Sequence, residues 1–363
     1  MTQDLLLEML RASFCNESSS MLSQYPQNES LLELAYQHDV GLLIGDRMQL
    51  NRSQRLANNI LKQKNLKRYH ENFVHFDPVA VEFENSNVEY VTTKGVYAAK
   101  TAYIDEGYRR SDDLDVIIKR EDYSKVREIL HAQGYIQGIY NSTTKTVKEF
   151  SRQQELFYLS YTQQSAPFLK ETGDDLVPVV NLDLNFHIFW DESEAWDISK
   201  LLSNSQILNY KGFKVRTFQD EYMLLHMCIH AYFDMNSVYI LYKSYAYRLK
   251  YFADIYGFIK RSKVSWSRFR SVCIDNKVEK YIMYILYYTA LVFQDDSLLT
   301  ITGLEMPSEV FLNRFGLENE GSFIWEESFL ERLFNTDRDI LLDKYFNEEM
   351  KLKISQGRSF EGM

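Results

Sequence analysis

The sequence predicts an α+β fold, in which a short mixed sheet with flanking helices lies between two helical regions. Apolar residues recur with helical spacing along the first part of the chain and again from Gln219 onward. Between these parts, short β-branched runs and one segment of strict apolar–polar alternation are typical of strands. We therefore expect an N-terminal helical region at 1–84, a sheet-containing core at 85–215 and a C-terminal helical region at 216–363.

The N-terminal region contains several helix signals. Leucine and methionine side chains share one face of the segment Asp4–Phe14, and the pattern continues at Leu31–Tyr36. Asn51 is a suitable N-cap for a helix that runs through Ile60. We expect a further helix to approach Pro78, or to kink there, because proline lacks the N–H that a helix interior uses.

The central region begins with two strands, each followed by a helix. Val88–Thr92 and Leu114–Ile118 are rich in β-branched residues and have the length of buried strands. Lys94-Gly95 opens a helical stretch after the first strand, and Asp122–Gln133 is an amphipathic helix after the second. Gly134 is well placed to end that second helix.

Two more strands are expected at Glu155–Tyr161 and Val177–Phe189. In the second, apolar residues alternate with Asp183, Asn185 and His187, so the polar side chains share the face opposite the core. The rest of the chain is expected to be helical over 222–233, 246–259, 266–274 and 278–293, with helices and loops over 300–363.

The composition is that of an ordinary globular protein. The chain has 363 residues, 45% of them hydrophobic and 25% charged. Three widely spaced cysteines form no disulfide framework, and neither a signal peptide nor an apolar run of about 20 residues occurs, so we expect a cytoplasmic protein without a membrane segment. The net charge of −10 does not favour nucleic acid as a partner, although it is compatible with a locally basic cleft.

Carboxylates gather at the start of the second strand. Asp113 and Asp115 are separated by one residue, which puts both side chains on one face of a strand. Mg²⁺ prefers carboxylate oxygens, and two such ions stabilise both ends of an in-line displacement at phosphorus. Asp183 can supply a third ligand if its strand is a neighbour. Most Asp-x-Asp pairs are solvated loop charges, but here the buried run Val116–Ile118 makes unneutralised acids costly.

These residues resemble a known family. The succession of Lys94-Gly95 at a helix start, Arg109, and Asp113-Leu114-Asp115 at a strand looks like the signature of a bacterial nucleotidyltransferase group within the DNA polymerase beta superfamily. The helix that ends in Gly134-Tyr135 and the later segment Leu182-Asp183-Leu184 fit the same pattern. The likeness implies a minimal nucleotidyltransferase core at the centre of the chain.

By this resemblance, Asp113, Asp115 and Asp183 would bind two Mg²⁺ ions and carry the catalysis. Relatives tend to have an acid followed two residues later by histidine, whereas this chain has Asn185 there. A shifted register would bring Asn185 and His187 to the site instead.

The resemblance also implies a nucleotide-binding set. Gly95 and the start of its helix would approach the triphosphate, while Lys94 and Arg109 would neutralise its charge. Gly95 is followed by Val96, where the superfamily usually has serine or glycine, so no hydroxyl is available. Of two histidines four residues apart, which lack the glutamate of a HExxH zinc motif, His230 is expected to face the nucleotide.

The implied activity is transfer of a nucleoside monophosphate from a nucleoside triphosphate, with ATP as first choice, and release of pyrophosphate. A small molecule, a peptide or protein side chain, and an RNA end stay open as acceptors. The alternative is a degenerate nucleotidyltransferase fold that binds a nucleotide or a partner without catalysis. The Gly95-Val96 departure favours the alternative, and the three acids favour the enzyme.

Overall fold

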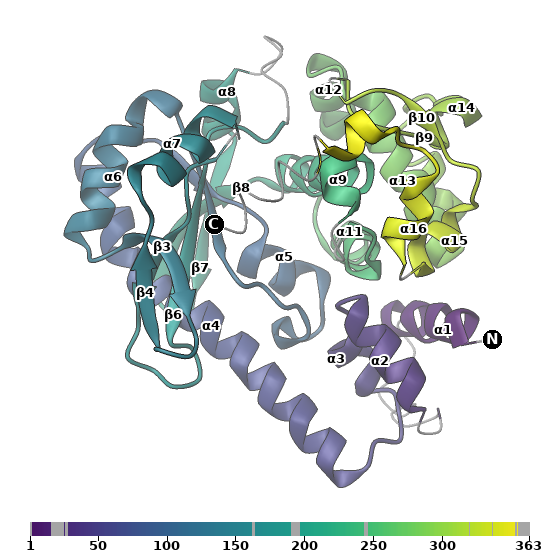
Figure 1. Cartoon of the computed structure of the whole chain (residues 1–363), viewed down its shortest axis with the longest axis horizontal. Helices are drawn as coiled ribbons and strands as arrows, with labels where there is room; N and C mark the ends of the chain where they lie inside the picture. The colour runs from purple at the N-terminus through teal and green to yellow at the C-terminus, as the bar shows by residue number, and fades with distance from the viewer. Residues whose placement is uncertain are drawn as a thin grey trace. The chain divides into compact units, whose positions relative to one another are not determined.

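The computed structural model describes residues 2–15, 25, 28–161, 164–189, 197–242, 246–318, 320–335, 337–352 and 354 (Figure 1). These residues form two compact units. The first, here called the sheet unit, comprises Leu50–His226 and Gly257–Lys277. The second, here called the helical unit, comprises the described residues of Met1–Gln49, Met227–Tyr256 and Val278–Met363. Each unit therefore combines stretches that are far apart in the sequence.

A mixed, eight-stranded sheet in the order β4-β3-β5-β6-β2-β1-β8-β7 forms the centre of the sheet unit. β2 pairs in parallel with β6, and β1 with β8, whereas the other neighbours are antiparallel. The strands are β1 (Tyr90–Thr92), β2 (Leu114–Ile118), β3 (Ile136–Asn141), β4 (Thr146–Glu149), β5 (Phe168–Glu171), β6 (Val179–Asn185), β7 (Ser205–Tyr210) and β8 (Phe213–Phe218).

The sheet unit also contains the helices α4 (Arg52–Asn85), α5 (Gly95–Ala102), α6 (Tyr123–Ala132), α7 (Arg152–Tyr161), α8 (Ile198–Ser203) and α12 (Trp266–Asp275), and the 3₁₀ turns η2 (Glu106–Tyr108) and η3 (Arg120–Asp122). The boundary between the units falls within α9 (Asp220–Asn236) and α11 (Leu249–Arg261).

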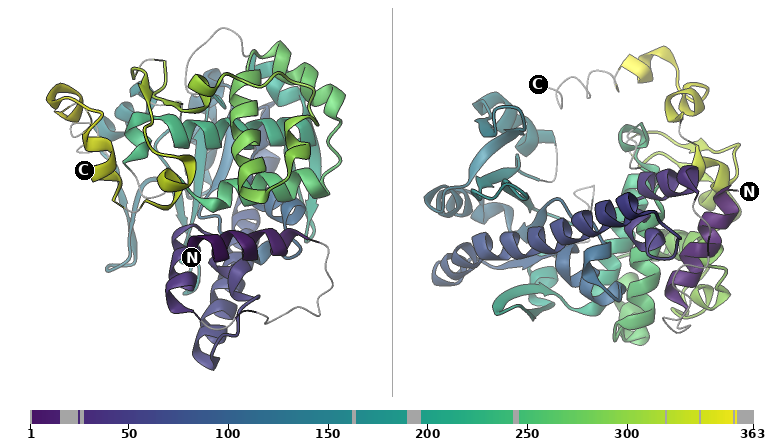
Figure 2. Two further views of the ribbon diagram at one scale, coloured as in Figure 1. Left: turned by 90° about the vertical axis from the view of Figure 1, so that its right-hand side faces the viewer. Right: turned by 90° about the horizontal axis from the view of Figure 1, so that it is seen from below.

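One face of the sheet is covered by α4 and α6 (Figures 1 and 2). The core between them contains Phe76 and Phe83 of α4, Leu130 of α6, and alternate residues of β2 and β6. Because side chains alternate across a strand, packing of this set sends the intervening residues of β2 and β6 to the opposite face. The hydrophobic core thus decides which face carries the polar side chains.

The helical unit contains α1 (Thr2–Phe14), α2 (Glu29–Gln37), α3 (Gly41–Gly45), α10 (Val238–Leu241), α13 (Glu279–Phe293), α14 (Glu309–Leu312), α15 (Phe329–Phe334), α16 (Arg338–Asp343), the 3₁₀ turn η4 (Asp296–Leu299), and a two-stranded sheet of β9 (Arg314–Phe315) and β10 (Phe323–Ile324). Most of α13 is buried. Within the described part of the chain, none of the helices is both long enough and apolar enough to span a membrane.

The α+β fold class is confirmed, but one expected strand is wrong. The segment Glu155–Tyr161 is not a strand; it belongs to helix α7, which Ser151 and Gln154 open with reciprocal side-chain-to-backbone hydrogen bonds. Pro78 lies inside α4, which continues to Asn85, and the kink expected there stays a prediction. Burial of Phe76 and Phe83 on either side of Pro78 stabilises the helix despite the hydrogen bond that proline cannot make.

Asn51 caps α4 as expected. Its side-chain oxygen accepts from the N–H of Gln54 at 2.9 Å, and the side-chain oxygen of Gln54 accepts from the N–H of Asn51. We expect Asn51→Ala to lower the free energy of unfolding by about 1 kcal/mol, because an orphan N–H at the helix start loses its acceptor. Asn51→Asp keeps an acceptor and should stay near the wild-type value. Urea denaturation measures the free energy of unfolding of both variants. An equal loss in Asn51→Asp and Asn51→Ala would show that the side-chain acceptor does not stabilise the helix.

Candidate active site

Three aspartates meet where β2 lies beside β6. The two strands are parallel, and their register places Asp115 directly opposite Asp183. Asp113 immediately precedes β2 and lies two residues from Asp115, on the same face. One carboxylate oxygen from each aspartate lies within 4.8 Å of the others. Residues about 70 positions apart in the sequence thus form one acidic cluster, here called the acidic triad.

The core on the other side of the sheet fixes this arrangement. Leu114 and Val116 of β2, and Leu182 and Leu184 of β6, are buried between the sheet and its helices. A one-residue slip of either strand would turn its two apolar residues into the acidic face and bury its acidic side chains. The position of the carboxylates is therefore set by hydrophobic packing.

The electrostatic environment of Asp183 disfavours its charged form. Burial raises its pKa well above the usual value of 3.8, and the charges of Asp113 and Asp115 raise it further, while a hydrogen bond from Asn181 and the charge of Lys94 oppose this shift. Its Oδ1 atom is buried and has no hydrogen-bond partner among the described residues. A divalent cation would supply both the missing partner and the missing charge, so the donor set fits a hard metal ion.

Lys94 and Gly95 form a strained turn between β1 and α5. Lys94 has φ 45° and ψ −112°, a conformation that residues with a Cβ atom rarely adopt, and Gly95 has φ 43°. The turn directs the ammonium of Lys94 to within 3.5 Å of Oδ2 of Asp115. A Cβ atom on Gly95 would meet nothing within 4 Å, so the backbone here borders open space at the start of a helix.

Arg109 supports this turn from within the protein. It is 5% exposed, and its guanidinium donates to the carbonyl of Gly95 at 3.4 Å. The carbonyl of Arg109 in turn accepts a hydrogen bond from the hydroxyl of Tyr69 on α4 at 2.7 Å. The structure therefore connects Arg109 to the Lys94-Gly95 turn through a contact with the backbone, whereas its expected role in neutralising the triphosphate stays a prediction.

The two polar residues that follow Asp183 differ in their contacts. The amide of Asn185 donates to Oδ1 of Asp115 at 3.3 Å, so Asn185 borders the acidic triad. His187 accepts a hydrogen bond from the N–H of Phe189 at 3.1 Å and lies beyond the end of β6. The unshifted register, with Asp183 opposite Asp115, is thus the one that the structure adopts.

The two histidines of α9 belong to different units. His230 lies in the helical unit, with Nδ1 3.5 Å from Oδ2 of Asp234. His226 lies in the sheet unit, where burial lowers its pKa well below 6.5 and the charge of Lys94 lowers it further. His226 therefore lies within electrostatic reach of the Lys94 turn, a proximity that the spacing of the histidines alone did not indicate.

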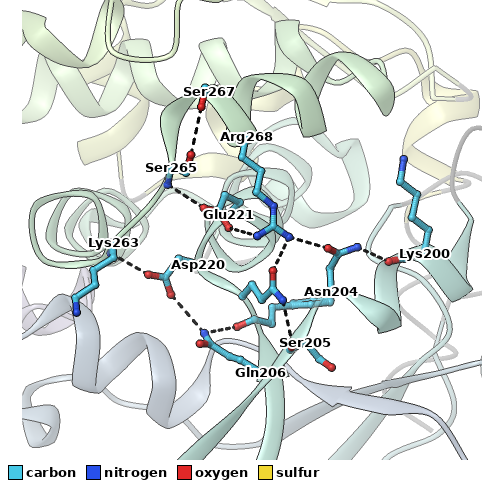
Figure 3. A network of polar contacts seen from close by, with 12 residues as sticks. Lys200, Asn204, Ser205, Gln206, Asp220, Glu221, Lys263, Ser265, Ser267 and Arg268 are labelled. Atoms are coloured by element: carbon cyan, nitrogen blue, oxygen red, sulfur yellow. Dashed lines mark hydrogen bonds and ion pairs between the residues drawn. The ribbon is translucent and has the colours of Figure 1, made fainter.

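A polar network surrounds the start of α9 (Figure 3) and also includes Tyr97 of α5. Asp220 accepts from the N–H of Lys263 at 2.9 Å and from the amide of Gln206 at 3.4 Å. Tyr97 on α5 donates to the same carboxylate and accepts from Gln206 at 2.9 Å. Because Tyr97 lies within the first turn of α5, this network holds the turn that carries Lys94.

Among solved structures, the chain is similar to an antigenic nucleotidyltransferase-like protein from Paracoccidioides brasiliensis, with 15% sequence identity, a TM-score of 0.35, and coverage of 66% of this chain and 95% of the other. No curated protein matches the chain.

The family comparison is more extensive. A model described as uncharacterised nucleotidyltransferase matches residues 26–294, a range that contains the acidic triad, the Lys94-Gly95 turn and both histidines of α9. This confirms the resemblance to nucleotidyltransferases. The chain belongs to the uncharacterised nucleotidyltransferase family.

Proposed function

We propose that the protein is a Mg²⁺-dependent nucleotidyltransferase of the DNA polymerase beta superfamily. It would move a nucleoside monophosphate from a nucleoside triphosphate, ATP first, to a nucleophile on a small molecule, a protein side chain or an RNA end, and release pyrophosphate. The observation that carries the proposal is the acidic triad, whose carboxylates converge within 4.8 Å on two adjacent parallel strands. Membership of a nucleotidyltransferase family supports the reaction class.

Asp113, Asp115 and Asp183 are the residues that would hold the metal. Bound Mg²⁺ would neutralise charge on the triphosphate and on the attacking oxygen. Asp183 would also take up the proton of the acceptor, because its Oδ1 has no competing hydrogen bond among the described residues and its pKa is raised by burial and by its acidic neighbours.

The Lys94 turn would bind the triphosphate. Its open backbone at Gly95 leads into the first turn of α5, whose N–H groups favour anions. The ammonium of Lys94 would exchange its contact with Asp115 for a phosphate oxygen once a metal neutralises that carboxylate. Arg109 would keep the turn in place through the carbonyl of Gly95. We also propose that His230 contacts the nucleotide.

One experiment tests the reaction class and identifies the acceptor. The protein is incubated with Mg²⁺, a metabolite pool or lysate, and each of the four labelled triphosphates in turn, and both pyrophosphate and labelled products are measured. We expect pyrophosphate and one labelled product class with a preferred base. Binding of Mg²⁺-ATP without pyrophosphate from any triphosphate would instead support the degenerate, nucleotide-binding alternative.

The first prediction concerns the triad. Asp115→Asn should lower the transfer rate by at least about 100-fold. The variant loses a charged ligand of the metal that would neutralise charge on the triphosphate and on the attacking oxygen. The matched control is Asp112→Asn, which removes a neighbouring carboxylate that pairs with Arg68 and Arg110 outside the triad. Pyrophosphate release should be close to wild type in the control. Equal rates in the two variants would remove Asp115 from the mechanism.

The second prediction concerns stability and pH. The native pKa of Asp183 is raised above its unfolded value, so the native state binds this proton more tightly and stability falls as pH rises through the native pKa. In a chelator at pH 7, Asp183→Asn should therefore be more stable than wild type by about 1 kcal/mol, or roughly 2–4 °C in Tm. The gain should shrink as the pH approaches 4, where Asp183 is protonated.

The controls for this prediction use the metal and a solvated acid. Added Mg²⁺ should raise the Tm of wild type more than that of Asp183→Asn, because the variant keeps only two of the three carboxylate ligands. Asp175→Asn, at a side chain that is fully exposed, should show neither effect. A destabilised Asp183→Asn in chelator would contradict the repulsion described for the triad.

The third prediction separates strain from charge at Lys94. Lys94→Gly and Lys94→Ala both remove the ammonium, but only glycine relaxes the backbone at φ 45°. We expect the glycine variant to be more stable than the alanine variant by about 1 kcal/mol in urea denaturation. Both should bind Mg²⁺-ATP about tenfold more weakly than wild type in calorimetry. Unchanged affinity in both would make Lys94 a structural residue.

A further inference from the structure

An asparagine lies two residues before Asp183 on β6. Along this strand, the half-buried residues Asn181, Asp183 and Asn185 alternate with buried ones, so their side chains share the face of the acidic triad. The register that pairs Asp115 with Asp183 continues two residues back along both strands. There it places Asp113 beside Asn181. Asn181 therefore adjoins two of the three acids, one along its own strand and one on the neighbouring strand.

The two ends of the Asn181 carboxamide have different environments. Burial raises the pKa of Asp183, and the charges of Asp113 and Asp115 raise it further, whereas a hydrogen bond from Asn181 opposes this shift. Only the NH₂ group of an asparagine side chain donates, so this bond uses the nitrogen end. The Oδ1 atom at the other end is buried and has no hydrogen-bond partner among the described residues. The acceptor end of the carboxamide is thus available to a ligand.

An acceptor of the neighbouring acid has the same property. Oδ1 of Asp183 is also buried and has no hydrogen-bond partner in the described part of the chain. The cation and the amide nearby act on Asp115 instead: the ammonium of Lys94 lies 3.5 Å from its Oδ2, and Asn185 donates to its Oδ1 at 3.3 Å. Buried polar atoms in native proteins are almost always paired. Two unpaired oxygens on successive positions of one strand face therefore indicate a group that binds oxygen, such as a hard cation.

A carboxamide is chemically suited to this position. Its carbonyl oxygen is a ligand that hard divalent cations accept. It is also uncharged, so it adds a ligand without adding to the repulsion among the three carboxylates. A purely structural role, in which Asn181 only donates to Asp183, would explain its nitrogen but not its buried oxygen.

We propose that Oδ1 of Asn181 is a further protein ligand of the divalent metal ion that Asp183 would bind. The inference rests on the metal site proposed above and extends its donor set to three carboxylates and one carboxamide, all of them oxygen ligands. Such a set favours Mg²⁺ and Mn²⁺ over softer ions. The nitrogen of the same side chain would hold the carboxylate of Asp183 beside the ion.

The first part of the test measures Mn²⁺ binding by calorimetry, with the full chain and without nucleotide. Asn181→Leu has a similar size but no oxygen, and should bind Mn²⁺ about tenfold more weakly than wild type. Asn181→Asp keeps an oxygen at the same place and should bind at least as tightly as wild type. The matched controls are the same two substitutions at Asn209, an exposed residue of β7, and both should bind like wild type.

The second part counts the water molecules on the bound ion, which a change in packing alone would leave unaltered. Eu³⁺ also takes oxygen ligands, and its emission lifetimes in H₂O and D₂O report how many waters it binds. The lifetimes are read from the emission that Mn²⁺ displaces. Water replaces a lost protein ligand, so Asn181→Leu should carry about one more water than wild type. Asn181→Asp should carry as many as wild type, and it keeps the test decisive if the leucine variant does not fold.

The inference is overturned if Asn181→Leu keeps the water count of wild type, as it would if a water molecule satisfied Oδ1. It is equally overturned if Asn181→Asp loses about one water, since its carboxylate would then fill a coordination position that the amide had left open. In either case, Mn²⁺ binding by wild type that is weakened in Asp183→Asn would leave the proposed metal site intact. Failure of wild type to bind Mn²⁺ would instead contradict the proposed metal site, and this inference with it.

Discussion

Mutual repulsion of three carboxylates is the constraint on which the site depends. Asp113, Asp115 and Asp183 lie together because β2 and β6 are parallel neighbours in one register. Apolar side chains on the opposite face of the sheet impose that register. The aspartates cannot move apart by a change of register without exposing this core. Hydrophobic burial thus keeps the three carboxylates close together despite their mutual repulsion. The free energy stored in this way becomes available to whatever cation binds there.

The groups around the triad neutralise this repulsion only in part. Lys94 reaches Asp115 at 3.5 Å, and Asn185 donates to the same carboxylate at 3.3 Å, whereas Oδ1 of Asp183 keeps no partner among the described residues. Lys94 is also held in a strained backbone conformation, supported through Gly95 by Arg109. Incomplete compensation and local strain together are typical of a site prepared for a ligand.

The parts of this site that are local in sequence could be predicted. Two acids one residue apart before a β-branched run predict a shared strand face, and the helical stretch from Val96 predicts a helix start at Lys94-Gly95. The structure has both features. Strict alternation around Asp183 likewise predicts its strand and its polar face. What the chain could not indicate by itself was the parallel pairing of β2 with β6, because a register between distant segments depends on the whole core.

The errors have similarly physical causes. Residues 155–161 contain a short apolar run, which periodicity cannot assign to strand or helix, and the capping pair Ser151 and Gln154 decides for the helix. Several strands were not expected, and β4 shows why: its residues Thr146–Glu149 are mostly exposed, so no apolar alternation marks them. The electrostatic link of His226 to Lys94 depends on tertiary packing of α9, which sequence spacing does not encode.

The central claim is that the acidic triad is a divalent-metal site at which a nucleotide binds. The most direct measurement is a crystal structure grown with Mn²⁺ and a non-hydrolysable ATP analogue, with the metal located by anomalous scattering. The account predicts anomalous peaks in contact with carboxylate oxygens of Asp113, Asp115 and Asp183, at about 2.0–2.6 Å as expected for oxygen ligands of such ions. Peaks elsewhere, or an Asp183 carboxylate more than about 6 Å from every bound metal, beyond direct or water-bridged coordination, would contradict it.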